Sequence, residues 1–381
     1  MPLPRFSARD LRARRLRRHL LTSTPGDATP AGVARAMHAA HAQIMSAAEI
    51  SVAMRLPGST RQTVRDALTR GTLTKTFGPR GTVHLVPTHD LAVWTSALSD
   101  VPRSRSAFAP DVRMSAEQTD EVVAAMAAAL LERELTVDEL DEQVVARTGP
   151  WAGDLVMPAF QTFWPRWRQA VSTAAHAGVL VFGPDRGRKV TYTNPRRRDP
   201  TFAPAPVGPA RREFVRGYLH AFGPAAPAHL ARWLNAPLDW CERLFADGGA
   251  EEVVADGAPA YVAPGDVEVD ELDRSVRLLP YFDALSVGFV PREVMFPGRA
   301  FDRALARGQA GNYPVVLVDG AVQGVWHQRR SGRRLHVTVE TWGQLGAGRV
   351  RALEEQVERL GEVLEASPTL TLGPVSVGPH A

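Results

Sequence analysis

The chain has 381 residues, a length that predicts two to four globular domains. Its residues are 44% apolar and 23% charged, a balance that excludes a disordered or fibrous protein. Its formal net charge is only +4, but basic residues cluster at 11–18, 186–189, 196–198 and 329–334. Because clustered cations attract phosphate backbones through counterion release, the pattern favours an anionic partner.

The first predicted element is a helix over residues 8–22. Leu11, Leu16 and Leu20 recur at roughly helical spacing with arginines between them. We expect an amphipathic helix whose basic side chains reach into solvent.

The residues that follow predict three helices and a β-hairpin. Caps, prolines, glycines and β-branched runs mark their limits. The elements are a helix begun by Thr29-Pro30, a buried helix over 47–56 ended by Pro57-Gly58, a helix between Ser59 or Thr60 and Gly71, and a hairpin of TLTKTF and TVHLV around GPRG. This order is typical of a winged helix.

A similar pattern returns twice. At 166–193 a helix ending near Gly178 precedes two strands joined by GPDRGRK. At 211–263 three helices precede the strand pair EEVVAD and PAYVA. Three such units imply a repeat of one supersecondary arrangement.

The chain changes character after residue 270. Runs such as LLPYFDALSVGF, PVVLVDGAVQGVWHQRR and RRLHVTVETW predict strands, closed by a helix over 346–365. Loop-like stretches at 101–120 and 199–210 mark domain boundaries. We therefore predict an α+β fold of three tandem winged-helix units and a small mostly-β C-terminal domain, with the regions 1–100, 101–200, 201–270 and 271–381.

Cysteine usage and hydropathy indicate the compartment. A single cysteine, Cys241, excludes an intramolecular disulfide and a cysteine-rich metal site. The N-terminus carries charges where a signal peptide needs an apolar run, and about 18 consecutive apolar residues occur nowhere. We expect a cytoplasmic protein without a membrane span.

Four stretches carry a resemblance to a known family, and their order and spacing are more specific than any one of them. The sequence resembles the AlkZ-type winged-helix DNA glycosylases, with YcaQ-like relatives, over nearly its whole length. The stretches are TRGTLTKTFGPRGTVHLVPTHDL (69–91), GVLVFGPDRGRKVTYT (178–193), LHAFGPAAPAHLARWL (219–234), and LLPYFDALSVGF with PVVLVDGAVQGVWHQRR (278–330).

The family's catalytic signature is Gln-x-Gln or Gln-x-Asp at the end of the second helix. The matching positions here read His41-Ala42-Gln43, so a histidine replaces the first glutamine. The resemblance implies that Gln43 and His41 are catalytic, although His41 also titrates near neutral pH, which glutamine does not.

The chemistry of alkylated purines suits such a site. An N7- or N3-alkylated purine is already cationic, so its departure needs little protonation. The remaining task is to place a water below the anomeric carbon and stabilise an oxocarbenium-like transition state. Gln43 would orient this water, and neutral His41 would orient it or accept its proton. Residues two apart face one side only in an extended segment, so 41–43 must be extended.

Basic and polar residues on the two hairpins are candidate DNA contacts. In the first hairpin, strand alternation is expected to put Arg80, Thr82 and His84 on one face. Asp283 and Arg292 match patterned positions of the family, where a structural role is favoured over a DNA contact. The candidates for DNA binding are Lys75, Arg80, Thr82, His84, Arg186, Arg188, Lys189 and Arg292.

Each candidate has an alternative explanation. His41 is otherwise a structural histidine at a helix end, and the hairpins are otherwise only solvated. His38 and His41, three apart on a helical segment with Glu49 as third ligand, would suit a metal, but no cysteine or acidic pair completes the set. A serine hydrolase is disfavoured because no G-x-S-x-G elbow occurs.

Taken together, the residues and the resemblance imply a monofunctional DNA glycosylase. It would act as a monomer on double-stranded DNA containing alkylated purines, leave an abasic site and need no cofactor. Lyase chemistry requires an amine nucleophile, and neither Lys75 nor Lys189 adjoins the triplet. The resemblance also implies that bulky natural-product adducts are substrates and that the protein serves self-resistance, because relatives of this type are linked to self-resistance in organisms that make DNA-alkylating compounds. The alternative is a non-enzymatic winged-helix transcription regulator.

Overall fold

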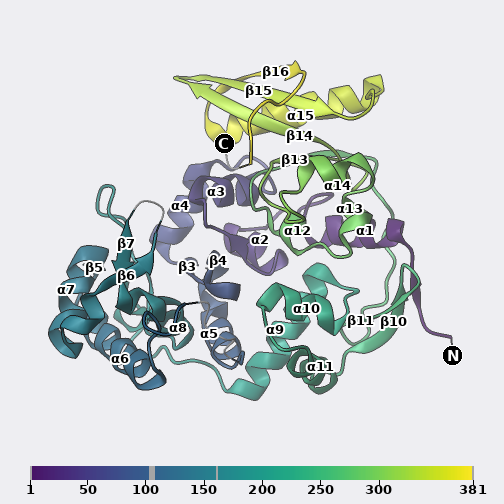
Figure 1. The fold of residues 1–381 in the computed structure, drawn as a ribbon. Coiled ribbons are helices and arrows are strands. Elements are labelled where there is room, and N and C mark those ends of the chain that lie inside the picture. The colour runs from purple at the N-terminus through teal and green to yellow at the C-terminus, as the bar shows by residue number, and fades with distance from the viewer. Residues whose placement is uncertain (1, 103–107, 160–161, 380–381) are drawn as a thin grey trace.

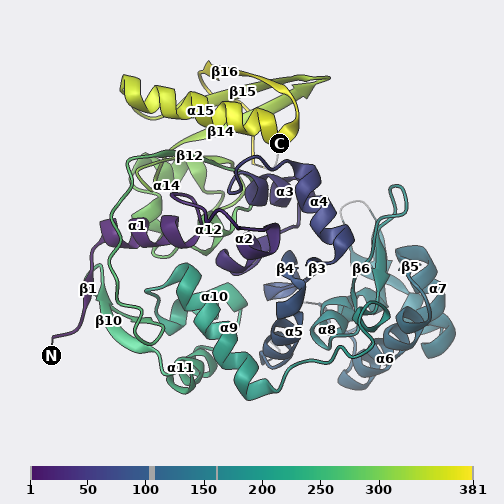
Figure 2. The same ribbon diagram turned by 180° about the vertical axis from the view of Figure 1, so that it is seen from behind.

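The computed structural model describes residues 2–102, 108–159 and 162–379, which fold into mixed helix and strand. The first helix-and-hairpin unit lies centrally, the second and third lie at either side of it, and the C-terminal sheet covers its top (Figures 1 and 2). No helix in the described ranges is both long and apolar enough to cross a membrane.

Unit I follows the predicted order of helices and hairpin. Its elements are α2 (Pro30–Ala36), β2 (Ala40–His41), α3 (Met45–Ala53), α4 (Arg61–Arg70), β3 (Leu73–Phe77), the 3-10 turn η1 (Pro79–Gly81), β4 (Val83–Pro87), η2 (Thr88–Asp90) and α5 (Leu91–Ser99). Thr29 and Thr60 cap α2 and α4, and α4 ends at Gly71, whose φ is +71°. The strands form a sheet in the order β2-β4-β3, and β2 and α5 were not predicted.

Unit II has a hydrophobic core built from its own helices and strands. Its elements are α6 (Ala116–Glu132), β5 (Leu135–Thr136), α7 (Val137–Thr148), η3 (Pro150–Gly153), β6 (Leu155–Pro158), β7 (Phe163–Pro165), η4 (Arg166–Ala170), α8 (Val171–His176), β8 (Val181–Phe182), β9 (Thr191–Thr193) and η5 (Pro195–Arg197). The prediction of a loop over 101–120 is wrong at its end, because Ser115 and Gln118 form a capping box that begins α6; residues 103–107 lie outside the described ranges.

Unit III contains the third predicted hairpin. Its elements are α9 (Val207–Phe222), α10 (Pro227–Leu234), α11 (Leu238–Asp247), β10 (Glu251–Ala255) and β11 (Ala258–Val262), joined by β1 (Arg5–Phe6), which pairs in parallel with β10. The boundary loop expected over 199–210 ends earlier than predicted, since α9 begins at Val207. Pro209 is tolerated because the first turn of a helix needs no N–H from it.

The C-terminal region is a five-stranded sheet in the order β12-β13-β14-β15-β16 with helices on it. Its elements are β12 (Val276–Leu279), α12 (Ala284–Gly288), α13 (Arg292–Met295), α14 (Arg299–Ala304), β13 (Val315–Val318), β14 (Ala321–Ser331), β15 (Arg334–Thr341), α15 (Ala347–Leu364) and β16 (Ser367–Leu372). The strand predicted through LLPYFDALSVGF ends at Leu279, and α15 does not close the domain, because β16 follows it and pairs with β15.

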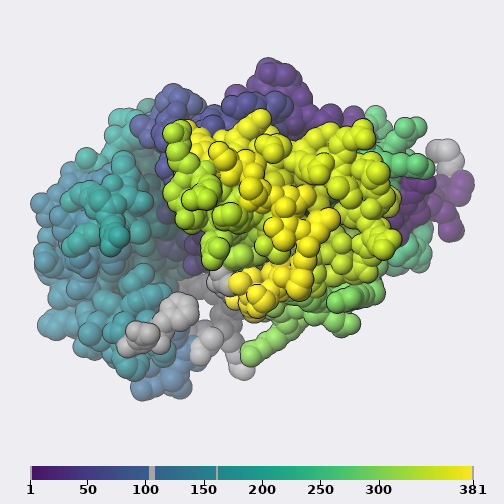
Figure 3. Space-filling view, turned by 90° about the horizontal axis from the view of Figure 1, so that it is seen from above, coloured from purple at the N-terminus to yellow at the C-terminus, as the bar shows by residue number. Residues whose placement is uncertain are grey.

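Unit I and the C-terminal region share one hydrophobic core. Val33 of α2 and Leu56 after α3 are buried in the same cluster as Trp326 of β14 and Leu360 of α15. Seen from above, residues of the C-terminal region form the face over the middle of the molecule (Figure 3). Unit I and the C-terminal region, which are far apart in the sequence, are therefore packed against each other.

Helix α1 (Ala8–Arg18) does not present the solvated arginine face that we predicted. Arg14 and Arg15 are fully buried. The Arg14 guanidinium donates to the carbonyls of Asp266 and Glu268, and that of Arg15 donates to those of Pro224 and Val290. The five donors of a guanidinium satisfy carbonyl groups that lack partners in loops, so this basic cluster joins unit III to the C-terminal region.

Candidate active site at the first hairpin

The His41-Ala42-Gln43 triplet does not lie at the end of a helix as predicted, because His41 is in strand β2 and Ala42 and Gln43 follow that strand. Helix α2 ends at Ala36, and a turn through His38 and Ala39, with φ values of +49° and +75°, leads into β2. The Ala42 N–H donates to the carbonyl of Val83 at 2.7 Å, which continues the pairing of β2 with β4. The strand pairing thus covers His41 and Ala42, whereas Gln43 lies in a bend, so the extended backbone predicted for residues 41–43 is present only in part.

His41 lies between one residue of the hairpin and one of the C-terminal region. It pairs across the strands with His84, their ring centroids 5.0 Å apart, and it stacks on Phe282 at 4.9 Å and 23°. Burial, followed by the charge of Arg80, lowers the pKa of His41 to about 4. His41 is therefore neutral at physiological pH, and its buried Nδ1 has no hydrogen-bond partner among the described residues.

A small cavity of about 10 Å³ lies against His41. That volume is close to the minimum needed for one water molecule. Units I and III and the C-terminal region all contribute to its wall, which is formed by His38, Ala39, His41, Pro79, Arg80, His84, Phe222, Trp233, Ala284 and Val287.

His84 is a wall of this cavity and not an exposed hairpin residue. Its side chain is 5% exposed because β4 is the central strand of its sheet, so the predicted alternation does not bring it to the surface beside Arg80. Its Nδ1 lies 2.9 Å from the carbonyl of Thr82, which can only accept, so Nδ1 carries the proton. Gly78 permits this position, since a Cβ there would lie 2.5 Å from His84 Nδ1.

Gln43 is exposed beside the hairpin, and its amide oxygen accepts from the Val83 N–H at 3.3 Å. This contact and the Ala42 hydrogen bond attach the triplet to one residue of β4. A side-chain amide fixed in this way has a defined orientation toward solvent, which positioning of a water molecule requires.

His38 is not placed as a metal ligand beside His41. The two residues are not on one helix, and His38 packs against the rings of Trp94, Phe214 and Trp233. Glu49, considered as a third ligand, is instead bound by arginine side chains of α4. Within the described ranges no three His, Cys, Asp or Glu residues form a group that could hold a metal ion.

His38 also separates the small cavity from a larger groove. This groove has a volume of about 600 Å³ and opens between α2, α5 and α9. Trp94 and Phe214 form its apolar part, and Arg35 and Asp90 form an ion pair at its edge. The groove adjoins the turn that carries the triplet.

The other candidate residues of the first hairpin differ in their exposure and in their contacts with other residues. Arg80 is exposed at the turn with φ +59° and has neither a hydrogen bond nor an ion pair to any described residue. The Thr82 hydroxyl donates to the carbonyl of Pro79 at 2.8 Å. Lys75 faces unit II, where its Nζ lies 4.4 Å from the ring centroid of Phe182. Arg80 is thus the most available cation of this hairpin.

The second hairpin is partly neutralised by acidic residues of α7. Arg186 forms an ion pair with Glu139 at 3.0 Å, and Lys189 forms one with Asp138 at 2.8 Å. Arg188 is exposed. Exposed pairs of this kind stabilise little, so a phosphate can replace the carboxylates.

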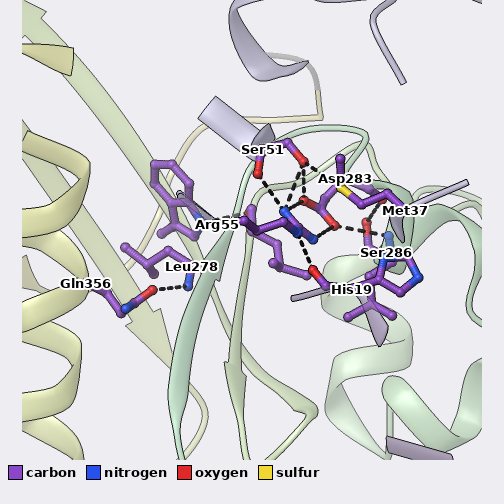
Figure 4. A network of polar contacts seen from close by, with 11 residues as sticks. His19, Met37, Ser51, Arg55, Leu278, Asp283, Ser286 and Gln356 are labelled. Atoms are coloured by element: carbon purple, nitrogen blue, oxygen red, sulfur yellow. Dashed lines mark hydrogen bonds and ion pairs between the residues drawn. The ribbon is translucent and has the colours of Figure 1, made fainter. Parts of the chain in front are cut away.

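Asp283 and Arg292 have structural contacts of the kind favoured from the sequence. Asp283 is fully buried and binds Arg55 through two hydrogen bonds of 2.8 and 2.9 Å, and Ser51 donates to it at 2.6 Å (Figure 4). Burial alone would raise the pKa of Asp283, but Arg55 and Ser51 lower it. The Arg292 guanidinium donates to three carbonyls at the end of α12.

Sequence reasoning missed two aromatic residues near the small cavity, Phe282, which stacks on His41, and Trp233, which lines the cavity. Phe282 precedes Asp283 and has φ +52°, and Trp233 lies in α10. Local patterns did not mark either residue, because their roles arise from contacts between distant segments. The one available signal was the position of Phe282 next to the patterned Asp283.

Known proteins resemble this chain over most of its length. A family model described as DNA glycosylase AlkZ-like matches residues 34–363. An interstrand DNA cross-link repair glycosylase of Streptomyces sahachiroi is 29% identical over 299 residues, covering 75% of this chain and 78% of the relative. The solved structure of Streptomyces sahachiroi DNA glycosylase AlkZ has a TM-score of 0.79 at 26% identity, covering 97% of this chain and 100% of that one. This chain, a DNA glycosylase, therefore belongs to the AlkZ-like family.

Proposed function

We propose that this DNA glycosylase is monofunctional and hydrolyses the N-glycosidic bond of N7- or N3-alkylated purines in double-stranded DNA. The observation that carries the proposal is a neutral imidazole, that of His41, in the wall of a small cavity, two residues before an amide, that of Gln43, which is tethered to the same strand β4. This pair suits a leaving group that departs without strong acid catalysis.

In the proposed reaction, Gln43 orients a water molecule and His41 accepts its proton. The water oxygen attacks the anomeric carbon, the electron pair of the glycosidic bond leaves with the alkylated purine, and an abasic site remains. A neutral imidazole can accept the proton and does not repel the developing oxocarbenium charge. The amine of Lys75 lies over the ring of Phe182, and that of Lys189 is paired with Asp138, so their positions favour hydrolysis over Schiff-base chemistry.

We further propose that units I, II and III are winged helices that bind duplex DNA together. Their shared pattern of helices followed by a hairpin supports this. The proposal places the unit boundaries near residues 101, 201 and 271 and includes a monomeric, cytoplasmic protein. The C-terminal region supports unit I through the common core. The candidate contacts Arg80, Arg188 and Arg292 would bind phosphates. Arg292 would first have to break one of its hydrogen bonds to the backbone carbonyls at the end of α12.

Bulky adducts are included in the proposed substrate class. The relative from Streptomyces sahachiroi is named for repair of interstrand cross-links, and its likeness to this chain supports adducts larger than a methyl group. The groove of about 600 Å³ beside the triplet offers space for part of such an adduct.

Base release from a defined duplex tests the proposal. We expect purified protein to convert duplex DNA with one N7-alkylguanine into alkali-labile abasic product, with undamaged duplex of the same sequence as control. The expected product is alkali-labile only, because no amine acts as nucleophile. Tight binding to one undamaged sequence without base release would instead support the transcription regulator considered above, which the family match disfavours.

A further inference from the structure

Two arginines beside the candidate active site lack the partners that most arginines of this protein have. Elsewhere Arg55 binds Asp283 and Arg303 binds Glu340. Arg80 and Arg232 form no hydrogen bond or ion pair with any residue in the described part of the chain, and both are exposed. Such guanidinium groups are available for an anion.

The fold brings these two cations together from different units. Arg80 lies in η1 of unit I and lines the small cavity with His41. Arg232 lies in α10 of unit III, next to Trp233, which lines the same cavity, and α10 packs against η1. Burial first and the charge of Arg232 second lower the pKa of Arg80, in agreement with two nearby like charges. Arg232 and Arg80, after burial, also lower the pKa of Arg292 to about 10.

The backbone holds Arg80 in a conformation that is unusual for its residue type. Its φ of +59° lies in the left-handed region, and Gly81 follows at +67°. Positive φ at a residue other than glycine has a conformational cost and is enriched at functional sites. The turn therefore keeps the Arg80 side chain beside the cavity and not along the hairpin.

We propose that Arg80 and Arg232 form a clamp for one backbone phosphate next to the nucleotide whose base is removed. Two guanidinium groups match the oxygens of a phosphate diester, whereas apolar or cationic ligands would leave their charges uncompensated. The assignment rests on the proposed function for its location, because His41 marks where the sugar must lie. Arg232 is thus a positioning residue contributed by unit III.

The clamp also solves an electrostatic problem of the proposed reaction. An oxocarbenium-like transition state is cationic, so bare arginines beside the cavity would oppose it. A phosphate diester bound between them carries one negative charge, so it offsets half of the charge of the two guanidinium groups and reduces their repulsion of the transition state. Binding of the DNA backbone and stabilisation of the transition state are then coupled, and a free alkylated nucleoside should be a poor substrate.

The salt dependence of DNA binding tests the clamp independently of catalysis. The probe is a duplex with a tetrahydrofuran abasic analogue, which binds but cannot be cleaved. Arg80→Ala and Arg232→Ala should each reduce the slope of log affinity against log salt by about 1. Arg232→Lys should restore the slope. Arg243→Ala, which removes an exposed arginine of α11 paired with Asp239, is the matched control and should leave the slope unchanged.

Neutral linkages locate the phosphate. A methylphosphonate placed at one linkage flanking an N7-alkylguanine should slow single-turnover base release by the wild type about 10-fold or more and slow the Arg232→Ala variant less, because that variant keeps only the Arg80 contact. Unchanged salt slopes in both alanine variants, or equal slowing of wild type and Arg232→Ala at every linkage, would overturn the clamp. Altered slopes without any base release by the wild type would leave the clamp standing and overturn the proposed glycosylase chemistry.

Discussion

At the scale of single residues, the environment of His41 decides what this unusual triplet can do. A histidine in water would be partly charged near neutral pH, but burial against Phe282 and His84 holds the pKa of His41 at about 4. His41 is therefore uncharged like the glutamine that it replaces, and it can in addition accept a proton.

This shifted pKa predicts the pH profile of base release. The lowered pKa keeps His41 neutral down to acidic pH. Wild-type activity should therefore stay level from pH 8 to about 5 and fall only as His41 becomes protonated toward pH 4. His41→Gln should be nearly inactive, because glutamine cannot accept the proton of the water, whereas substantial activity without this fall would show that His41 mainly orients water. Single-turnover rates of base release across this pH range measure the profile, and circular dichroism at each pH is the folding control. A fall centred near pH 6.5, or one that persists in His41→Gln, would contradict this role.

The sequence identified the triplet but not its surroundings. His41 and Gln43 were found because their spacing matches a family signature. Phe282, Trp233 and Arg232 were not found, since nothing local distinguishes a residue that packs against His41 or lies at the small cavity from any other core or surface residue. Their roles depend on contacts between distant segments, which a single sequence does not contain.

At the scale of elements, turn and cap chemistry predicted unit I almost completely. Thr29, Thr60 and Gly71 mark helix limits that the structure confirms. The elements missed in this unit were β2 and α5. Strands of two residues, such as β2 and β5, show no alternation, and their pairing depends on a partner elsewhere in the chain.

The buried Arg55–Asp283 pair joins α3 to α12 and fixes the segment that holds Phe282 against His41. Arg55→Met should lower the free energy of unfolding by about 3–5 kcal/mol, because it leaves the Asp283 carboxylate buried without its counter-charge. Adding Asp283→Asn should recover part of this loss, since asparagine can still accept from Ser51 and Leu285. Urea unfolding measures both.

Asp239→Asn provides the matched control for this pair, since it breaks the exposed Asp239–Arg243 contact on α11 and should not change the unfolding midpoint measurably. Equal stability of the wild type and Arg55→Met would show that the ion pair does not hold α3 and α12 together.

At the scale of the whole molecule, the fold class was predictable and the use of charge was not. Periodicity and turns indicated mixed helix and strand in a repeated order. The basic cluster at 11–18 suggested a solvated surface, yet Arg14 and Arg15 are internal and bind carbonyl groups of unit III and the C-terminal region. Composition reports how many cations a chain has, and only the packing shows which of them remain free for DNA.

The candidate active site lies where three regions meet, so binding and chemistry should be separable by substitution. Gln43→Ala and His41→Ala should each lower single-turnover base excision by at least ~100-fold, because both side chains act on the attacking water. DNA affinity should stay within a few-fold, since neither residue belongs to the phosphate contacts. Binding is measured on the tetrahydrofuran duplex and excision on N7-alkylguanine duplex. Full excision activity in both alanine variants would show that the triplet is not the catalytic site.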